Sequence, residues 1–291
     1  MKRSARKSKV RGNSYPSPKT GERVGHRKSS SSLKTGKRVG QSKSSALYLY
    51  CITEKNGAHR IAAAGVDGAG AVEAARCGDF WCWISTVSRA DFADRLNDNM
   101  QNLEWLAAAG VRHQEVVSKI AAQADVLPAR FATVFLTLDS LREDVQRRRV
   151  ELRRSLGRVR GADEWGVKIY ALARPAPQPV SGELSGRGYL ERKSQLLEST
   201  MRGRAKNDPE IETFAKELKR ISREAVTAGG MSRGQPGVLW QRSFLIPRQN
   251  RKKLMQALEK YAQRWRQVRR IECTGPWPPY SFVSAAGQAM E

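Results

Sequence analysis

The sequence has no uninterrupted apolar run approaching the ~18–20 residues that a membrane-spanning helix needs. Its basic N-terminal part also lacks the apolar stretch of about 7–15 residues that marks a secretory signal peptide. This part shares the arginine and serine richness of transit peptides, but its glycines, prolines and missing apolar stripe argue against an amphipathic helix. We therefore expect a cytoplasmic protein that has no membrane partner.

Cysteine and histidine are also scarce. The four cysteines, Cys51, Cys77, Cys82 and Cys273, form neither a disulfide framework nor a paired Cys-x-x-Cys metal motif. Only three histidines accompany them, and His26 lies in the basic N-terminal part. We expect buried free thiols and no metal site, because an unpaired cysteine packs as a small apolar side chain.

Motifs of catalysis and nucleotide binding are missing as well. The stretch Gly65–Gly70 lacks the Gly-Lys-Ser/Thr ending of a phosphate-binding loop and does not fit the dinucleotide fingerprint, so we expect a flexible connection. His113 lies on the apolar stripe of a predicted helix without a nucleophile motif, which favours a packed histidine hydrogen-bonded to a neighbouring strand. The carboxylates Asp79, Asp91, Asp94 and Asp98 precede or begin helices, where they complement the helix dipole. The sequence predicts no catalytic residue, cofactor or small-molecule substrate.

Positive charge dominates the chain and is concentrated at its start. The chain carries 53 Lys and Arg against 28 Asp and Glu, a net charge of +25. Residues 1–46 hold 14 of these cations and one acid, Glu22, which gives +13. Their large apolar residues are scattered singly, and Lys19–Gly25 is nearly repeated as Lys34–Gly40. We expect a disordered, low-complexity basic tail, which either binds nucleic acid and other polyanions nonspecifically or acts as a solubilising arm.

Strand and helix patterns recur after this tail. Alternating apolar residues predict strands at Leu47–Ile52, Ala58–Gly65, Phe80–Val87, Arg130–Leu136, Trp165–Tyr170, Val238–Ile246 and Arg269–Cys273. Apolar residues at helical spacing predict helices over Leu103–Ile120, Leu141–Leu156, Gly188–Gly203, Pro209–Ala225 and Leu254–Trp265. An aspartate before Pro209 supplies a helix cap, and the proline suits the first helical position.

The order of these elements indicates an α+β fold. Their number fits two domains better than one, and we expect an α+β domain at residues 47–159 and a second domain at residues 160–283. The second domain has the order strand, helices, strand, helix, strand, which suits a modified ferredoxin-like sheet with a helical insertion. Residues 284–291 would form a flexible end.

The predicted helix over Leu141–Leu156 carries a row of arginines. They are candidate polyanion contacts: Arg147, Arg148, Arg149, Arg153 and Arg154. The competing interpretation is a solvated helix face, because Glu143, Asp144 and Glu151 are interleaved with the arginines and offer partners at i,i+4 spacing, such as Asp144 for Arg148.

The last ordered-looking stretch is Thr-Gly-Pro-Trp-Pro-Pro-Tyr-Ser-Phe-Val at residues 274–283. Three prolines around Trp277 cannot continue a helix or a central strand, because proline lacks the donor and fixes φ. We expect a rigid extended segment that ends the domain, with Trp277, Tyr280 and Phe282 packed against the body.

Four sequence blocks follow one another in a recognisable order. They are Val126–Phe135 (Val-Leu-Pro-Ala-Arg-Phe-Ala-Thr-Val-Phe), Glu164–Tyr170 (Glu-Trp-Gly-Val-Lys-Ile-Tyr), Ser185–Leu190 (Ser-Gly-Arg-Gly-Tyr-Leu) and Thr274–Phe282. In order and spacing they resemble the signature blocks of the gas vesicle protein F/L (GvpF/GvpL) family, and the resemblance spans residues 47–283. Ala132 stands where the family usually has glycine, and residues 1–46 have no counterpart.

The resemblance implies a non-enzymatic accessory or minor structural protein in the nucleation and assembly of gas vesicles, the protein-shelled buoyancy compartments of bacteria and archaea. It implies binding to the small hydrophobic major shell protein and to other accessory proteins, at the gas vesicle in the cytoplasm. The signature residues become candidate partner contacts: Arg130, Phe131, Trp165, Trp277, Tyr280 and Phe282. The alternatives are a nucleic-acid or polyanion-binding protein that acts through its basic tail, and an uncharacterised enzyme.

Overall fold

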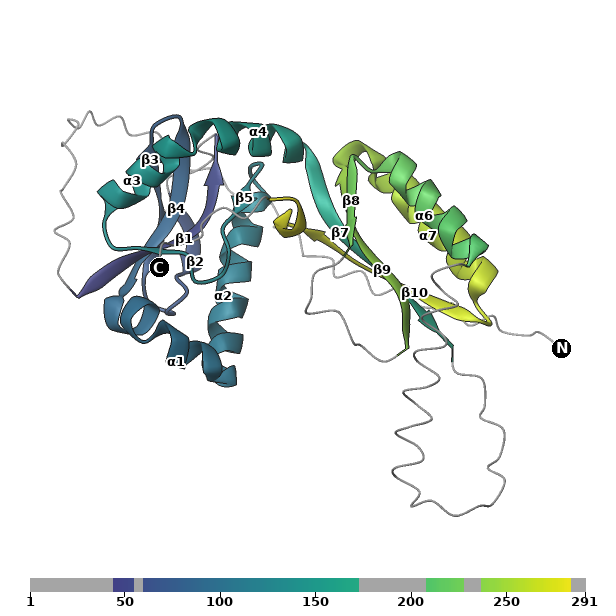
Figure 1. Ribbon diagram of the computed structural model, residues 1–291, viewed down its shortest axis with the longest axis horizontal. Helices are drawn as coiled ribbons and strands as arrows, with labels where there is room; N and C mark the ends of the chain where they lie inside the picture. Colours follow the sequence, from purple (N-terminus) through teal and green to yellow (C-terminus); the bar gives the residue numbers. More distant parts are fainter. Residues whose placement is uncertain (1–43, 55–59, 173–207, 228–236, 284–291) are drawn as a thin grey trace, which may run out of the picture. The chain divides into compact units, whose positions relative to one another are not determined.

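The computed structural model describes residues 44–54, 60–172, 208–227 and 237–283 (Figure 1). Contacts divide the chain into Met1–Gly40 and Gln41–Glu291, and every described residue belongs to the second unit. The basic tail up to residue 43, the helix predicted at Gly188–Gly203 and the C-terminal end after residue 283 lie outside the described residues.

The first part of the described chain forms a six-stranded antiparallel sheet around a buried central strand. The sheet has the order β2-β3-β4-β1-β5, and β6 also pairs with β1. Its strands are β1 (Ser45–Thr53), β2 (Arg60–Ala64), β3 (Ala71–Cys77), β4 (Phe80–Ser88), β5 (Leu127–Pro128) and β6 (Val134–Phe135). Every residue of β1 from Ala46 to Thr53 is buried, as its continuous apolar pattern predicts for a strand covered on both faces.

Helices cover the two faces of this sheet. The helices are η1 (Ala90–Asp94), α1 (Leu96–Gln101), α2 (Leu103–Ala121), α3 (Leu138–Arg147) and α4 (Arg149–Val159). Alternate residues of β1 pack against opposite helices, because successive side chains of a strand point to opposite faces. Leu47 and Leu49 share a core with apolar residues of α3 and α4, whereas Tyr48 and Tyr50 share one with apolar residues of α2.

The second part forms a four-stranded antiparallel sheet with the order β10-β7-β9-β8. Its described elements are β7 (Ala162–Ala171), α6 (Pro209–Ile221), β8 (Glu224–Thr227), β9 (Val238–Pro247), η3 (Arg248–Asn250), α7 (Arg251–Trp265), β10 (Arg269–Trp277) and η4 (Tyr280–Phe282). Among the described residues, the main elements therefore follow the β-α-β-β-α-β order of the ferredoxin-like motif. Helices α6 and α7 lie together over the sheet (Figure 1).

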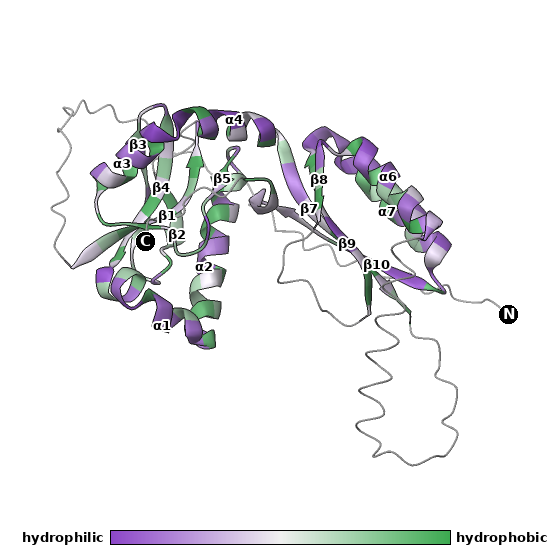
Figure 2. Cartoon of the chain, in the orientation of Figure 1, coloured by the Kyte–Doolittle hydropathy of each residue, from purple (hydrophilic) through white to green (hydrophobic). Residues whose placement is uncertain are grey.

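Helices α6 and α7 are amphipathic and meet the sheet through aromatic side chains. Figure 2 shows hydrophilic and hydrophobic residues alternating along both helices. Phe214 of α6 packs against Tyr261 and Trp265 of α7, with ring centroids 4.8 and 5.4 Å apart, and these rings lie over Trp165 and Phe244 of the sheet in one core. Packing of these apolar faces, rather than helix propensity, stabilises the two helices.

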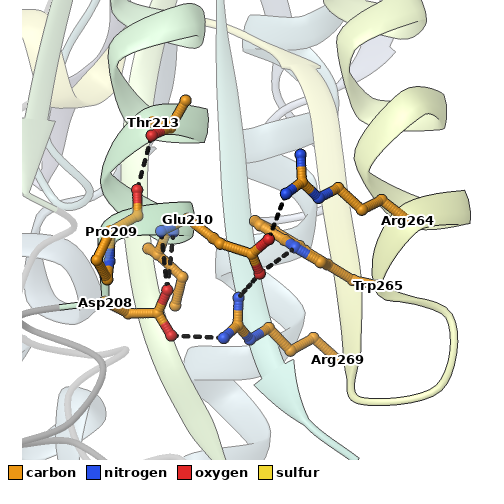
Figure 3. Close-up of polar contacts among 8 residues, drawn as sticks. Asp208, Pro209, Glu210, Thr213, Arg264, Trp265 and Arg269 are labelled. Carbon is orange, nitrogen blue, oxygen red and sulfur yellow. Dashed lines mark hydrogen bonds and ion pairs between the residues drawn. The ribbon is translucent and has the colours of Figure 1, made fainter.

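A network of charged residues fixes the start of α6 beside the end of α7 (Figure 3). Asp208 accepts hydrogen bonds from two backbone N–H groups of the first helical turn and pairs with Arg269 at 2.5 Å. Glu210 accepts from Arg264, from the indole of Trp265 and from Arg269, at 2.6, 3.2 and 3.4 Å. Because Arg269 contacts both carboxylates and lies over the Trp265 ring, this network joins α6, α7 and β10.

Most predicted elements are confirmed, but one strand is missed and three element boundaries are wrong. Strand β3 is missed, since its sequence Ala-Val-Glu-Ala-Ala-Arg-Cys is rich in alanine, a weak strand former. The stripe assigned to one helix ends at Ile221, and Ala225 belongs to the separate strand β8. The helix predicted over Leu141–Leu156 is two helices that break at Arg148, and β1 begins two residues before the expected Leu47.

One loop prediction and one strand prediction also need correction. The stretch Gly65–Gly70 is an ordered turn rather than a flexible connection, because Gly65 N donates to Gly70 O at 2.7 Å and the Asp67 carboxylate accepts from two backbone N–H groups. The strand predicted at Arg130–Leu136 is reduced to the two residues of β6, because a turn precedes it.

Candidate functional site

The C-terminal segment, residues 274–283, crosses from the second sheet to the first. Strand β10 pairs with β7 up to Thr274, and the register then shifts so that Trp277 lies opposite Glu164. Gly275 has φ +132°, and a Cβ there would lie 2.8 Å from the Glu164 carbonyl and 3.0 Å from the Trp165 ring. The Gly-Pro-Trp block thus lies directly against the Glu-Trp-Gly block, and this close approach leaves room for glycine only. The peptide bond between Gly275 and Pro276 is cis.

Three consecutive residues anchor the end of this segment. The Ser281 backbone N–H and hydroxyl donate to the carboxylate of Glu164, at 2.8 and 2.6 Å. The Phe282 ring is fully buried in a core that holds Leu156 of α4 and Leu245 of β9, and Arg158 donates to the Phe282 carbonyl. These contacts tie the chain end to elements of both sheets.

The third anchor is Tyr280, which hydrogen-bonds to a buried histidine. His113 of α2 lies between two tyrosine hydroxyls, Nδ1 3.0 Å from Tyr48 and Nε2 3.0 Å from Tyr280. The predicted bond to a neighbouring strand is thus confirmed, since Tyr48 lies on β1. Burial lowers the pKa of His113 to about 4 and raises the pKa of both tyrosines. The histidine is therefore neutral at pH 7, and its two ring nitrogens hold the hydroxyls of Tyr48 and Tyr280.

The central block, Val126–Phe135, packs on the other side of the same histidine. The Phe131 ring lies 5.8 Å from the His113 ring and 6.3 Å from the Tyr48 ring. Ala132 has φ +64°, in the left-handed region that favours glycine, and its N–H donates to the Tyr48 hydroxyl at 3.0 Å. The glycine expected at this position is thus explained by the backbone, and alanine occupies it at a conformational cost.

The structure separates the six signature residues into two groups. Phe131, Trp165, Tyr280 and Phe282 serve internal packing, whereas the side chains of Arg130 and Trp277 are exposed. The expectation that Trp277 packs against the body is wrong, because 44% of its surface is exposed. Buried Pro278 and Pro279 and the three anchors hold the segment instead.

The partners of these residues could not be found from the sequence. Glu164 and Ser281 lie 117 positions apart, and His113 and Tyr280 lie 167 apart. A glutamate inside an alternating strand pattern carries no signal of a distant hydroxyl partner. Glu164 alternates with the core residues Trp165, Val167 and Ile169, so the strand pattern assigns it to the opposite face of β7 and gives no sign of its burial.

The arginine row on α3 and α4 is largely neutralised by the protein itself. Arg149 and Arg153 each bind Asp79 at 2.7 Å, and hydrogen bonding from Arg149 lowers the pKa of Asp79. Asp79 lies between β3 and β4, so its expected role at a helix start is wrong.

Of the other three arginines in the row, two are paired with an acidic residue and one is not. Arg147 and Arg148 both pair with Asp144, and the predicted bond between Arg148 and Asp144 is 3.3 Å long. Arg148 is also too buried to present an open cationic face. Arg154 is exposed and makes no ion pair within the described residues.

All four cysteines lie in the described residues and are free thiols. Cys51, Cys77 and Cys82 are buried free thiols, as predicted, and Cys273 is half-buried. In the described ranges, no three His, Cys, Asp or Glu side chains come together in a way that could hold a metal ion. Within the same residues, no helix is both long and apolar enough to cross a membrane. The described part is an α+β protein with two antiparallel sheets, whose C-terminal signature residues Tyr280 and Phe282 contact elements of the first sheet and its helices.

Comparisons with known proteins show which family this chain belongs to. The family model described as gas vesicle synthesis protein GvpL/GvpF matches residues 46–284. The chain is 30% identical over 226 residues to gas vesicle protein L of Streptomyces sp. (strain CB03234), covering 72% of this chain and 82% of that protein. The chain therefore belongs to the GvpL/GvpF family of gas vesicle proteins.

Solved structures show the same fold. The crystal structure of GvpF from Anabaena sp. PCC7120 aligns with a TM-score of 0.61 at 22% identity, over 83% of this chain and 99% of that one. The crystal structure of GvpF from Microcystis aeruginosa aligns with a TM-score of 0.59 at 19% identity, over 82% and 99%.

Proposed function

We propose that this chain is a non-enzymatic accessory or minor structural protein in gas vesicle nucleation and assembly. It would bind the major shell protein and other accessory proteins, in the cytoplasm and at the vesicle. Family membership supports the connection to gas vesicles. The observation that carries the binding role is Trp277, a signature aromatic residue that stays exposed while its neighbours in the same block are anchored.

The physical reason for such a role lies in the assembly problem. A shell subunit that associates through apolar surfaces is prone to aggregate before it is incorporated, so a partner that covers those surfaces can control nucleation. Exposed aromatic and arginine side chains on a rigid support are common anchors of protein interfaces. Trp277 and Arg130 meet this description, because each is exposed next to a buried residue in the chain. Pro278 follows Trp277, and Ala129 precedes Arg130.

Deletion and complementation test the proposal. Deleting the gene in vesicle-forming cells without a paralogue should leave few or no gas-filled vesicles by electron microscopy. Restoring the gene with Trp277→Ala should give normal protein levels, reduced recovery of the shell protein in a pull-down, and fewer vesicles. Met255→Ala, at an exposed apolar residue of α7, is the matched control and should restore assembly. Normal vesicle number and shape in the deletion strain would contradict the assembly role.

A second candidate function is nonspecific binding of nucleic acid or other polyanions through the basic tail. The supporting observation is the charge of +13 in residues 1–46. Each phosphate neutralised on duplex DNA should contribute roughly −0.9 to the slope of log affinity against log salt. A chain that begins at Gln41 should fold, retain partner binding and lose most of this salt-sensitive affinity. Equal DNA binding by the two chains at every salt concentration would place the cationic surface elsewhere.

The division into two domains is likewise a proposal. The break would lie between α4, which ends at Val159, and β7, which begins at Ala162. Phe282 and Leu245 share a core with residues of α3 and α4, so the proposed domains would be joined by apolar contacts. Differential scanning calorimetry of the full chain tests whether they unfold separately, and a single two-state transition would count against the division.

A further inference from the structure

A groove opens between the turn after β2, helix η1 and the first half of α2. It has a volume of about 420 Å³. Its floor is apolar and partly aromatic, formed by Phe92, Trp105 and Ala109, and the two aromatic ring centroids lie 5.3 Å apart. Phe92 and Ala109 are buried, while Trp105 is half-buried and shows part of its ring to the groove. The volume falls at the low end of the roughly 300–1,000 Å³ found for pockets that take small ligands, which is enough room for one long side chain.

Three carboxylates lie along this groove: Asp67, Asp91 and Glu104. Asp67 is fixed by two backbone N–H groups of its turn, at 3.0 and 2.9 Å. Asp91 pairs with Arg95, which is well exposed. Glu104 makes no ion pair within the described part of the chain. The groove therefore presents acceptors that a second positive group can reach.

The lining includes one cation, Arg112, which is already engaged. Its guanidinium donates to the Val66 carbonyl at 3.2 Å and packs beneath Gly68, whose added Cβ would lie 3.4 Å from Arg112 Cζ. The lining thus holds three carboxylates against one guanidinium, and Arg95 beside it neutralises Asp91, so Asp67 and Glu104 are the carboxylates left without an ion pair among the described residues. Residues 47–291, in contrast, carry 39 Lys and Arg against 27 Asp and Glu. The groove is a local acidic site on a basic protein.

We propose that this groove binds a basic side chain, arginine or lysine, flanked by apolar residues on an exposed segment of a partner protein. The aliphatic stem of such a side chain suits the apolar floor, while its charge reaches the carboxylates. The Trp105 ring adds attraction, because an aromatic face attracts a cation within about 6 Å. An anionic ligand is disfavoured by the carboxylates, and a wholly apolar segment would cover Glu104 without giving it an ion-pair partner.

The proposal deepens the assembly role by giving the chemistry of one partner segment. It rests on that role only in assigning the segment to a gas vesicle protein. Binding of a basic peptide in vitro and the deletion phenotype in cells can fail independently, so the two proposals are tested separately.

Titration calorimetry on the full chain tests the groove. The probe is an amidated octapeptide that alternates leucine and arginine, and the control peptide replaces each arginine by glutamine. We expect saturable binding of the arginine peptide, weakened by salt, with an affinity about tenfold higher than that of the glutamine peptide. Glu104→Gln should weaken binding of the arginine peptide by roughly fivefold, because it removes one carboxylate.

Two neighbouring positions on α2 provide a matched pair of variants. Both Ala108 and Ala107 are exposed, but only Ala108 lines the groove. Ala108→Arg should abolish peptide binding by filling the groove with a cation, whereas Ala107→Arg, with the same change in charge, should retain it. Circular dichroism checks that both variants fold.

Three outcomes would overturn the proposal. Equal binding by the Ala108→Arg and Ala107→Arg variants would place the peptide elsewhere. Equal affinity for the arginine and glutamine peptides would remove the role of charge. Displacement of the peptide by spermidine at the same concentration would show that a small polyamine, rather than a protein segment, is the occupant.

Discussion

Phe282 and Trp277 belong to the same C-terminal segment, but the structure gives them opposite roles. The Phe282 ring is fully buried, whereas Trp277 is 44% exposed. Truncating a buried phenylalanine to alanine costs about 3–5 kcal/mol, because apolar contacts are lost and a cavity remains. The neighbouring anchors at Tyr280 and Ser281 are retained, so the cost is confined to the Phe282 pocket.

For a domain of this size, a loss of 3–5 kcal/mol lowers the melting temperature by roughly 6–20 °C. Trp277→Ala removes a ring that lies outside the buried cores and is 44% exposed, and it should change stability by about 1 kcal/mol or less. Thermal unfolding followed by circular dichroism measures both variants against the wild-type chain. We expect Phe282→Ala to lose stability and Trp277→Ala to lose recovery of the shell protein. A larger thermal shift for Trp277→Ala than for Phe282→Ala would refute this assignment of roles.

Two further predictions concern the network around His113. Ala132→Gly should raise stability by up to about 1 kcal/mol, because relief of the left-handed strain exceeds the added entropy of the unfolded chain; a lower urea midpoint than wild type would contradict it. His113 has its pKa lowered from 6.5 to about 4 by burial, so the unfolded state binds more protons between these values and stability must fall as pH falls from about 6.5 to about 4. The His113 contribution amounts to at most about 3 kcal/mol. His113→Gln should flatten this part of the stability profile, and an unchanged slope would show that other groups, such as the ion-paired carboxylates, cause it.

The local sequence pattern was sufficient to predict the strands and helices that bury one continuous face. The β1 strand, the second half of the α2 stripe from His113 to Ile120 and the apolar positions of α7 lie where their spacing predicts, because burial follows the period of 2 or 3.6 residues. The first residue of the α2 stripe, Leu103, is 79% exposed instead. The pattern failed for β3 and β8, whose residues are held by pairing with β4 and β9 rather than by their own propensity.

The sequence by itself determined the family, through four ordered blocks, and it determined the cap of α6, the free thiols and the excess of positive charge. It also marked Ala132 as an unusual residue at a glycine position. These features are local in the chain, so a residue and its near neighbours suffice to recognise them.

Only the tertiary structure decided what each signature residue does. It placed Tyr280 on His113, Ser281 on Glu164 and Phe282 in the core beneath α4, and it left Trp277 exposed. It also paired Arg149 and Arg153 with Asp79, which the sequence assigned to a helix start. These contacts join positions 70 to 167 residues apart. Their partners are set by how the sheets and helices pack, and no local pattern encodes that choice.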